Sequence, residues 1–380
     1  MSSITAVSPA DIETLLSICR LELGTANAPD CTAIANNRWD GLLATAIEHG
    51  LVGQLQKTAS TTESIPVSSL RSIETAFLEQ ATRNFQLTDA LFEILHCFRD
   101  CAIDVAVLKG PAVALITGGQ IARREFRDLD LLVHPGDINR AAVALGELGF
   151  QQTSGDLPNR KGEKDIQFVR DSDKVLVELH WLINAPARSF PLEATGIWDR
   201  LQTVYFQNEP ISTPGLEDTF LALCIHGSVH GWTSIKWAFD IARIVRYKAA
   251  SLDWATLMQR SKSVGCNRAL LVSVQLVSLL FGVKPPDEMA TQMSGESSTG
   301  RLAERIRLTI LANEPLSGSD RIASHIQIHD RLWGRFSVAY KYLPVPDSHQ
   351  IPWRPLRYMI RSRELIRLYG HKWLRTMICE

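Results

Sequence analysis

The sequence lacks the cysteine spacing that holds a zinc ion or a framework of disulfides. Its seven cysteines are scattered, their number is odd, and no two of them form a CxxC pair. Cys97 and Cys101 are one helical turn apart, but two ligands alone do not close a zinc site. We therefore expect reduced thiols, as in the cytosol, and no zinc centre.

An excess of charge, a long apolar run and a leader are also missing. The formal net charge of −1 argues against a protein that coats nucleic acid or a membrane. No apolar run reaches the roughly 20 residues that span a bilayer. Residues 1–9 lack the basic start and apolar centre of a signal peptide. These absences predict a cytoplasmic protein with no membrane partner, and they disfavour nucleic acid as a partner.

Helical spacing of apolar residues dominates the N-terminal region, residues 1–84. The length of 380 residues suggests two or three domains, or one core with helical additions. We expect a helix that starts at Ser8-Pro9, a second over Trp39–Leu51 and a long one over Ile73–Cys101.

The region after residue 215 is again predicted to be helical. Helices are expected over Leu216–Val229, over Ser234–Arg246 and twice between residues 252 and 283, so that region 216–290 packs on the core. The small, polar stretch Gln292–Gly300 predicts a loop or linker.

The last region, residues 301–380, is predicted to be helical with a basic tail. Seven Lys and Arg residues lie between Arg354 and Arg375. Such a tail can bind a polyanion or an acidic partner, and its alternative is a solvated helix face.

Residues 85–215 show a different pattern, in which short strands alternate with helices. The expected strands are 105–108, 128–133, 166–169, 175–181 and 203–206, and the expected helices are 112–116 and 138–148. Residues 150–165 are mostly polar and predict a loop around a weak strand. The fold class is therefore α+β: a small mixed sheet embedded between helical N- and C-terminal regions.

Two acids lie one residue apart on one of these strands. Asp128 and Asp130 point to the same face of a strand, whereas Leu129, Leu131 and Val133 point to the other face, into a core. Two acids on one face repel each other unless a cation lies between them, and Mg²⁺ or Mn²⁺ prefers such oxygen ligands. The alternative is an edge strand with two solvated acids.

A glycine turn and a basic segment precede the acidic pair. The turn Lys109-Gly110-Pro111 joins a strand to a helix, and the free amides of a helix start are a natural phosphate site. Arg123, Arg124 and Arg127 then lead into the acidic strand; their alternative is solvated loop charges.

A third acid lies on a later strand. Glu178 and His180 share one face of the strand over 175–181, which suggests a site shared with the acidic pair. His226 and His230 are four residues apart on one predicted helix. Asp240 lies in an apolar segment, and Lys236, Arg243 or either of these histidines is a candidate partner for it.

The ordered set of these motifs resembles a known family. The set consists of Leu108-Lys109-Gly110, Arg124–Arg127, Asp128–Val133, the helix that ends at Leu148-Gly149-Phe150, and Val177–Trp181. In this order and spacing it is similar to the uncharacterised nucleotidyltransferase-like family of the DNA polymerase beta-type nucleotidyltransferase superfamily. The resemblance covers about residues 85 to 250.

The resemblance implies a metal-dependent nucleotidyltransferase that moves a nucleoside monophosphate from an NTP, such as ATP, to a small-molecule or peptide acceptor. Asp128, Asp130 and Glu178 would be catalytic and would bind Mg²⁺ or Mn²⁺. Lys109 and Gly110 would hold the triphosphate, and Arg124, Arg127 and His180 would line the nucleotide site.

One departure from the superfamily leaves a second interpretation open. The wider superfamily has a Gly-Ser pair at the helix start, whereas the turn here is Lys109-Gly110-Pro111, with no serine and a longer gap to the acids. Gly118-Gly119 has the nearer spacing but follows no convincing strand, so we assign the turn to Lys109-Gly110. The alternative function is a non-catalytic binding module that keeps the nucleotidyltransferase fold.

Overall fold

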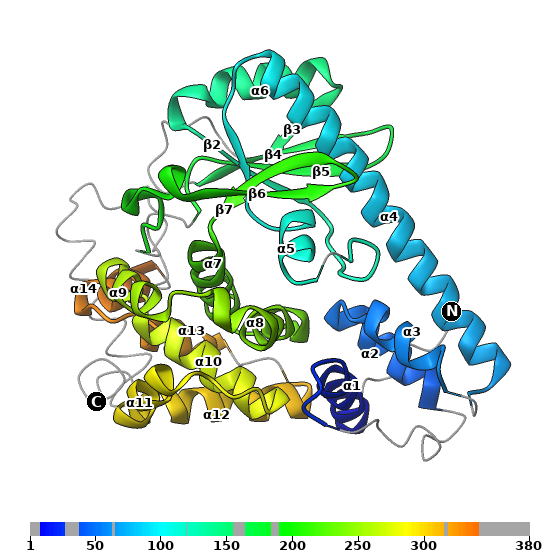
Figure 1. The fold of residues 1–380 in the computed structure, drawn as a ribbon, viewed down its shortest axis with the longest axis vertical. Coiled ribbons are helices and arrows are strands. Elements are labelled where there is room, and N and C mark those ends of the chain that lie inside the picture. Colours follow the sequence, from blue (N-terminus) through cyan, green and yellow to red (C-terminus); the bar gives the residue numbers. More distant parts are fainter. Residues whose placement is uncertain are drawn as a thin grey trace, which may run out of the picture.

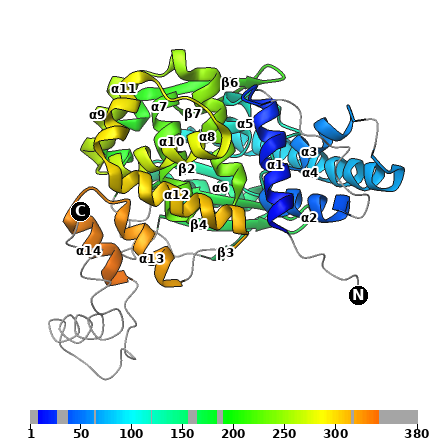
Figure 2. The same cartoon turned by 90° about the horizontal axis from the view of Figure 1, so that it is seen from below.

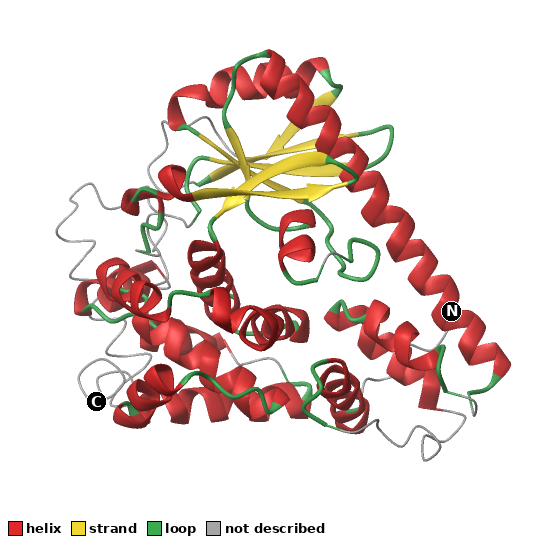
Figure 3. Cartoon of the chain, in the orientation of Figure 1, coloured by secondary structure: helices red, strands yellow, loops and turns green. Residues whose placement is uncertain are grey.

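The sheet expected in the middle of the chain is present, and helices from both ends of the chain surround it (Figures 1 and 3). The computed structural model describes residues 8–26, 38–62, 65–118, 120–154, 164–183, 190–314 and 318–341. The architecture belongs to the predicted α+β class, with a mixed sheet of five strands.

The five strands lie in the order β1-β2-β5-β4-β3. β2 pairs with β5 in parallel, and the other neighbouring pairs are antiparallel. The strands are β1 (Val105–Val107), β2 (Leu129–Val133), β3 (Phe150–Ser154), β4 (Asp165–Arg170) and β5 (Val175–His180). β1, β2, β4 and β5 fall on predicted strands, and β3 occupies the start of the segment expected to be a loop around a weak strand.

The alternation of side chains in β2 separates an apolar face of the sheet from a polar one. Leu129, Leu131 and Val133 pack into a core formed with α4 (Val67–Asp100) and α6 (Ile138–Glu147), which cover that face (Figure 1). Burial of this apolar surface stabilises the contact at about 25 cal/mol per Å². The polar face is turned the other way, toward the helices of the C-terminal half.

α4 is longer at its N-terminus than predicted. It begins at Val67 after Pro66, rather than at Ile73. Three serines in its first two turns had obscured the helical pattern in the sequence. It also runs without interruption through residues 84 and 85, where the sequence pattern had suggested a division between the helical N-terminal region and the core.

A short helix and a hairpin complete the region around the sheet. The helix is α5 (Pro111–Ile116), and the hairpin consists of β6 (Leu201–Phe206) and β7 (Glu209–Pro214). The Thr213 hydroxyl donates a hydrogen bond of 2.8 Å to the carbonyl oxygen of Val107, which attaches the hairpin to β1. β7 was not predicted, because its two prolines and its polar residues obscure the strand pattern.

Three helices form the described N-terminal part: α1 (Pro9–Glu22), α2 (Trp39–His49) and α3 (Val52–Ala59). Ser8 caps α1 as predicted, in a reciprocal capping box with Asp11. Gly50 ends α2 in a left-handed conformation with φ of 68°. α3 was not predicted as a separate helix.

The C-terminal half is a layer of helices. They are α7 (Leu216–Val229), α8 (Ile235–Lys248), α9 (Trp254–Val264), α10 (Asn267–Phe281), α11 (Asp287–Gly295), α12 (Ser297–Ala312), α13 (Gly318–Gln327) and α14 (Leu332–Lys341). Short 3-10 turns lie at Pro135–Asp137, Glu193–Thr195, Ile197–Arg200 and Ala249–Ser251.

Helices from the two ends of the chain share one core. α1 packs against α10 and α12, and the largest buried apolar cluster contains residues of α1, α2, α7, α8, α10 and α12 (Figure 2). The N-terminal helices and the C-terminal layer therefore support each other, and α7 and α8 lie below the sheet (Figure 1).

The linker predicted over Gln292–Gly300 is wrong. The stretch is helical except for a break at Glu296, between α11 and α12. Thr299 is fully buried and donates a hydrogen bond to the carbonyl oxygen of Glu296. Packing against α10 orders this segment despite its small and polar composition.

Several sequence predictions lie outside the described residues. They include the basic tail between Arg354 and Arg375, Gly119, and most of the polar stretch between β3 and β4. Among the helices that the structure describes, none has both the length and the apolar character that a membrane span requires.

Candidate active site

The parallel pairing of β2 and β5 places Asp130 and Glu178 beside each other. The two residues are register partners in the sheet, so their side chains lie on the same, polar face. β5 was predicted to carry the third carboxylate, and the sheet makes it the direct neighbour of β2. Two of the three expected carboxylates are therefore adjacent by strand pairing alone.

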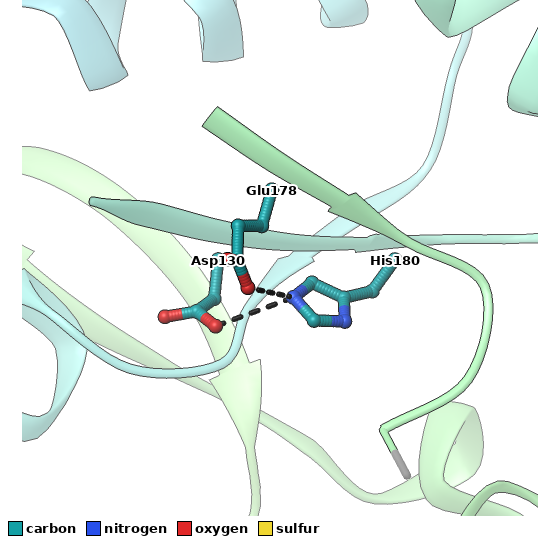
Figure 4. Close-up of side chains that lie close together, drawn as sticks. All are labelled: Asp130, Glu178 and His180. Atoms are coloured by element: carbon teal, nitrogen blue, oxygen red, sulfur yellow. Dashed lines mark ion pairs between the residues drawn. The ribbon is translucent and has the colours of Figure 1, made fainter. Parts of the chain in front are cut away.

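His180 completes a compact group of donor atoms with these two carboxylates (Figure 4). Its Nε2 lies 3.2 Å from Asp130 Oδ1 and 3.4 Å from Glu178 Oε2. One donor atom from each of the three residues lies within 4.8 Å of the other two. Asp130 and His180 are buried, and Glu178 is half-buried.

Lys109 neutralises part of this negative charge. Its Nζ donates a hydrogen bond of 2.7 Å to Asp130 Oδ1. Burial opposes the charge on Asp130, but Lys109 and His180 outweigh it and hold the pKa of Asp130 well below its ordinary value. The same ion pair overcomes the burial of Lys109 and raises the pKa of its amine. Both groups are therefore ionised at neutral pH.

His180 and Glu178 each favour the charged form of the other. Burial disfavours the charged imidazole, but the carboxylates of Asp130 and Glu178 outweigh it and raise the pKa of His180. His180 in turn lowers the pKa of Glu178, against the effects of burial and of Asp130.

Asp128 lies one residue before β2 rather than within it. It lines the same cavity as Asp130, which agrees with the predicted common face. Burial and the charge of Asp130 raise the pKa of Asp128 to about 6. Among the described residues, the group of converging donor atoms contains Asp130, Glu178 and His180 but not Asp128. Asp128 lies beside this group and is the acid of the site that is protonated most readily.

Two adjoining cavities open on this polar face, between the sheet and α7–α8. The first has a volume of about 260 Å³ and the second about 380 Å³. The first is lined by Gly110, Arg127, Asp130, Lys236 and Trp237, among others; the second by Lys164, Asp165, Glu178, His180 and His230, among others. Both are lined by Lys109, Asp128, Leu223 and His226. Lys109 and Asp128 thus lie where the two cavities meet, with Asp130 on the wall of the first cavity and Glu178 on the wall of the second.

The expected glycine turn borders the first cavity. Gly110 has φ of 55° and ψ of −121°, a conformation that residues with a Cβ rarely adopt. A Cβ built on Gly110 would find ordinary space, 3.5 Å from the Asp128 carbonyl oxygen, so backbone conformation rather than crowding requires glycine here. The turn directs the Lys109 amine to Asp130.

Arg124, predicted to line the nucleotide site, lies at the wall of the first cavity and pairs with a buried acid. Its Nε and Nη2 donate hydrogen bonds of 3.0 and 2.8 Å to the two carboxylate oxygens of Asp240. Its Nη1 donates to the Gly110 carbonyl oxygen at 3.2 Å. Asp240 therefore pairs with Arg124 and not with the candidates weighed from the sequence. The guanidinium, although at the wall of the first cavity, supports the glycine turn.

Arg127 lies at the rim of the first cavity, with 69% of its side chain exposed and an ion pair to Glu125 at 2.9 Å.

Lys236, in the first turn of α8, is a cation of the site that the sequence pattern did not reveal. Its Nζ donates to the carbonyl oxygen of Glu125 at 3.0 Å. Burial and Arg124 lower the pKa of Lys236. The sequence feature that could have identified Lys236 is its position in the first turn of a predicted helix.

His226, in the last turn of α7, and His230, which directly follows this helix, line the site. Their rings are 4.5 Å apart, and the ring of Trp237 meets the ring of His226 edge-on at 4.8 Å. Burial and the charge of Lys109 hold the pKa of His226 well below its ordinary value, so its imidazole is neutral. His226 lines both cavities and His230 lines the second, which places α7 opposite the acids.

β4 contributes polar residues that were not predicted as part of the site. Gln167 Nε2 donates a hydrogen bond of 3.0 Å to Glu178 Oε1, and Lys164 Nζ lies 2.7 Å from Asp165 Oδ2. The sequence does contain a pattern that could have identified them. Asp165 and Gln167 alternate with Ile166 and Phe168, which places both polar side chains on the face of Glu178.

The donor chemistry of the group fits a divalent cation. Two carboxylates and one imidazole lie within reach of one ion, and all are ligand types for divalent metals. The buried Nε2 of His180 makes no hydrogen bond of acceptable geometry among the described residues, although two carboxylates lie near it. A buried nitrogen of this kind suits a metal ligand.

Comparisons with known proteins yielded one family and one solved structure to report. The chain matches the model of a family described as "Uncharacterised nucleotidyltransferase" over residues 35–282. No curated protein matches it. It is similar to the crystal structure of an antigenic nucleotidyltransferase-like protein from Paracoccidioides brasiliensis, with 16% sequence identity and a TM-score of 0.32. That match covers 54% of this chain and 93% of the other chain.

Proposed function

This chain belongs to the uncharacterised nucleotidyltransferase family, as its motifs predicted, and we propose that it transfers a nucleoside monophosphate from an NTP to an acceptor in a metal-dependent reaction. The observation that carries the proposal is the register pairing of Asp130 with Glu178 across two parallel strands. It places two carboxylates side by side, and Lys109 donates a hydrogen bond to one of them, Asp130.

The reaction requires charge neutralisation and positioning rather than covalent chemistry by the protein. The acceptor hydroxyl oxygen forms a bond to the α-phosphorus, the bond between that phosphorus and the bridging oxygen breaks, and pyrophosphate leaves. The proton of the hydroxyl passes to Glu178, which His180 keeps ionised. Lys109, at the junction of the two cavities, neutralises charge on the phosphates.

Asp130 and Glu178, with Asp128 and His180 beside them, would hold the Mg²⁺ or Mn²⁺. When bound, such ions supply Lewis-acid neutralisation of the charge on the attacking and leaving oxygens.

The two cavities suggest a division of the substrates. The first contains Lys236, Arg127 and the glycine turn, and therefore suits the polyphosphate of the NTP. The second contains Glu178, the proton acceptor of the proposal, and therefore suits the acceptor molecule. Its volume of about 380 Å³ is in the range of small-molecule sites, which supports a small acceptor or the end of a peptide.

The position of Glu178 also bears on the alternative of a non-catalytic binding module. A module that had lost the reaction would not need a second acid beside Asp130. Glu178 lies within the donor group of Asp130 and His180, and Gln167 orients its carboxylate. This arrangement supports the enzyme over the module.

Nucleotide binding provides the test of the proposal. ATP, GTP, CTP and UTP are each titrated by calorimetry with Mg²⁺ or Mn²⁺, and transfer is followed with α-phosphate label and pools of small molecules and peptides. We expect at least one NTP to bind only with metal. Asp130→Asn should reduce transfer by about 10²-fold or more, because it removes transition-state charge stabilisation of several kcal/mol.

The matched control is Asp171→Asn, on the hairpin turn between β4 and β5, where 73% of the side chain is exposed. It should behave as the unmodified protein does. Failure of every NTP to bind with either metal refutes the proposal.

A further inference from the structure

His180 differs from an ordinary core histidine in the surroundings of its buried Nε2. It lies at the end of β5 with only 1% of its side chain exposed, and Figure 4 shows its ring pointing at the carboxylates of Asp130 and Glu178. Its Nε2 lies 3.2 and 3.4 Å from their oxygens without forming a well-directed hydrogen bond. A core histidine normally has its buried nitrogens hydrogen-bonded.

The neighbouring strand supplies an outer layer of support for this group. Across the antiparallel pair, Asp165 is the register partner of His180 and Gln167 is that of Glu178. Asp165 Oδ2 lies 3.9 Å from His180 Nδ1, on the side of the ring away from Asp130. Gln167 holds Glu178 Oε1 and leaves Oε2 directed at His180.

The usual support of a metal-bound imidazole is an oxygen that accepts a hydrogen bond from the second ring nitrogen. Asp165 Oδ2, at 3.9 Å from His180 Nδ1, is beyond hydrogen-bond range, and the Lys164 ammonium is nearer to this nitrogen at 3.4 Å. Lys164 Nζ also lies 2.7 Å from Asp165 Oδ2, so an ion pair packs behind the ring without fixing its tautomer.

We infer that Asp130, Glu178 and His180 form a mixed nitrogen–oxygen centre that takes Mn²⁺, or another first-row transition-metal ion, in preference to Mg²⁺. Imidazole suits transition metals, whereas Mg²⁺ demands oxygen ligands in near-octahedral geometry. The catalytic meaning of this centre rests on the proposed function, but the identity of its ligands is testable without any nucleotide.

Pulsed electron paramagnetic resonance of bound Mn²⁺ tests the inference directly, because a coordinated imidazole nitrogen modulates the spin echo. The full-length protein is loaded with Mn²⁺ alone. We expect nitrogen modulation in the unmodified protein and its loss in His180→Asn. The matched control is His226→Asn, which changes a histidine that lines both cavities and should retain the modulation.

Affinity measurements extend the test to the metal preference. His180→Asn should lower Mn²⁺ affinity and reduce the preference for Mn²⁺ over Mg²⁺. An unchanged preference for Mn²⁺ in His180→Asn would contradict the mixed nitrogen–oxygen centre.

Three results would overturn the nitrogen ligand: no modulation in the unmodified protein, modulation that persists in His180→Asn, or modulation lost in His226→Asn. If His180→Asn does not fold, His226→Asn and His230→Asn identify the nitrogen ligand by elimination. Modulation that persists in both leaves His180 as the histidine of the site that coordinates the metal.

NTP binding on the same samples separates the two proposals. Nitrogen modulation without NTP binding refutes only the nucleotidyltransferase, and metal-dependent NTP binding without modulation refutes only the ligand assignment.

Discussion

Lys109 Nζ lies 2.7 Å from Asp130 Oδ1, the same oxygen that lies 3.2 Å from His180 Nε2. The amine therefore lies beside the carboxylate oxygen to which a metal ion would also bind. Asp130 is only 2% exposed, and a buried carboxylate requires a partner of opposite charge. Lys109 is that partner in this structure, so metal binding requires it to share Asp130 or to leave it.

The first prediction concerns Lys109→Met. Removal of the competing amine should raise the affinity for Mn²⁺ without nucleotide by about 10-fold, which corresponds to about 1.4 kcal/mol. The same variant should bind NTP more weakly, because a cation near the phosphates is lost. Titration of Mn²⁺ followed by electron paramagnetic resonance measures the first effect, and calorimetry measures the second.

Lys236→Met is the matched control for that prediction, because Lys236 also lines the first cavity but pairs with Glu125 instead of Asp130. Its Mn²⁺ affinity should equal that of the unmodified protein. A fall in Mn²⁺ affinity in Lys109→Met would show that the amine assists metal binding instead of competing with it.

The second prediction concerns the division between the two cavities. Lys236→Met should weaken binding of an NTP by about 10-fold, and binding of the corresponding monophosphate much less, since charge-assisted hydrogen bonds to phosphate contribute roughly 1.5–3 kcal/mol. Calorimetry with the two nucleotides and Mn²⁺ measures the difference. Equal weakening of both would place Lys236 away from the β- and γ-phosphates.

The third prediction concerns the buried pair of Arg124 and Asp240. Arg124→Lys should reduce the free energy of unfolding by about 3 kcal/mol or more, because a lysine cannot make the two-point contact and leaves Asp240 poorly compensated. Urea denaturation measures the change. Arg127→Ala, at an exposed ion pair, should change stability by less than about 1 kcal/mol. A stable Arg124→Lys with weak NTP binding would return Arg124 to the nucleotide site.

The fourth prediction concerns the dependence of stability on pH and the buried residue His329. His329 is buried against Phe190, with ring centroids 4.3 Å apart, and burial together with Arg335 lowers its pKa to about 4. An unfolded histidine has a pKa near 6.5, so between pH 6.5 and 4 the unfolded chain binds a proton that the folded chain does not. Stability should therefore fall as the pH falls through this window, by about 3 kcal/mol in total.

Unfolding in urea at a series of pH values measures this loss. His329→Asn should remove the contribution, because asparagine does not titrate. His96→Asn, in which a half-exposed histidine is changed, should retain it. A slope of stability against pH that is the same in His329→Asn and in the unmodified protein would contradict the assignment.

Local sequence patterns determined much of the fold and part of the site. Alternation in β2 and β5 predicts which side chains face away from the core, and it assigns Asp130, Glu178 and His180 to the polar faces of their strands. The glycine turn follows in the same way, from a strand, a glycine and a proline in succession. Each of these features depends on neighbouring residues, and short-range periodicity records them.

Only the tertiary structure decided which side chains meet. The adjacency of β2 and β5, and the register that pairs Asp130 with Glu178, depend on strand pairing between segments far apart in the chain, which periodicity does not encode. The same holds for the support from β4, for Lys236, and for the pairing of Arg124 with Asp240 across 116 residues. The residue types were visible in the sequence, but packing and hydrogen-bond geometry selected the partners.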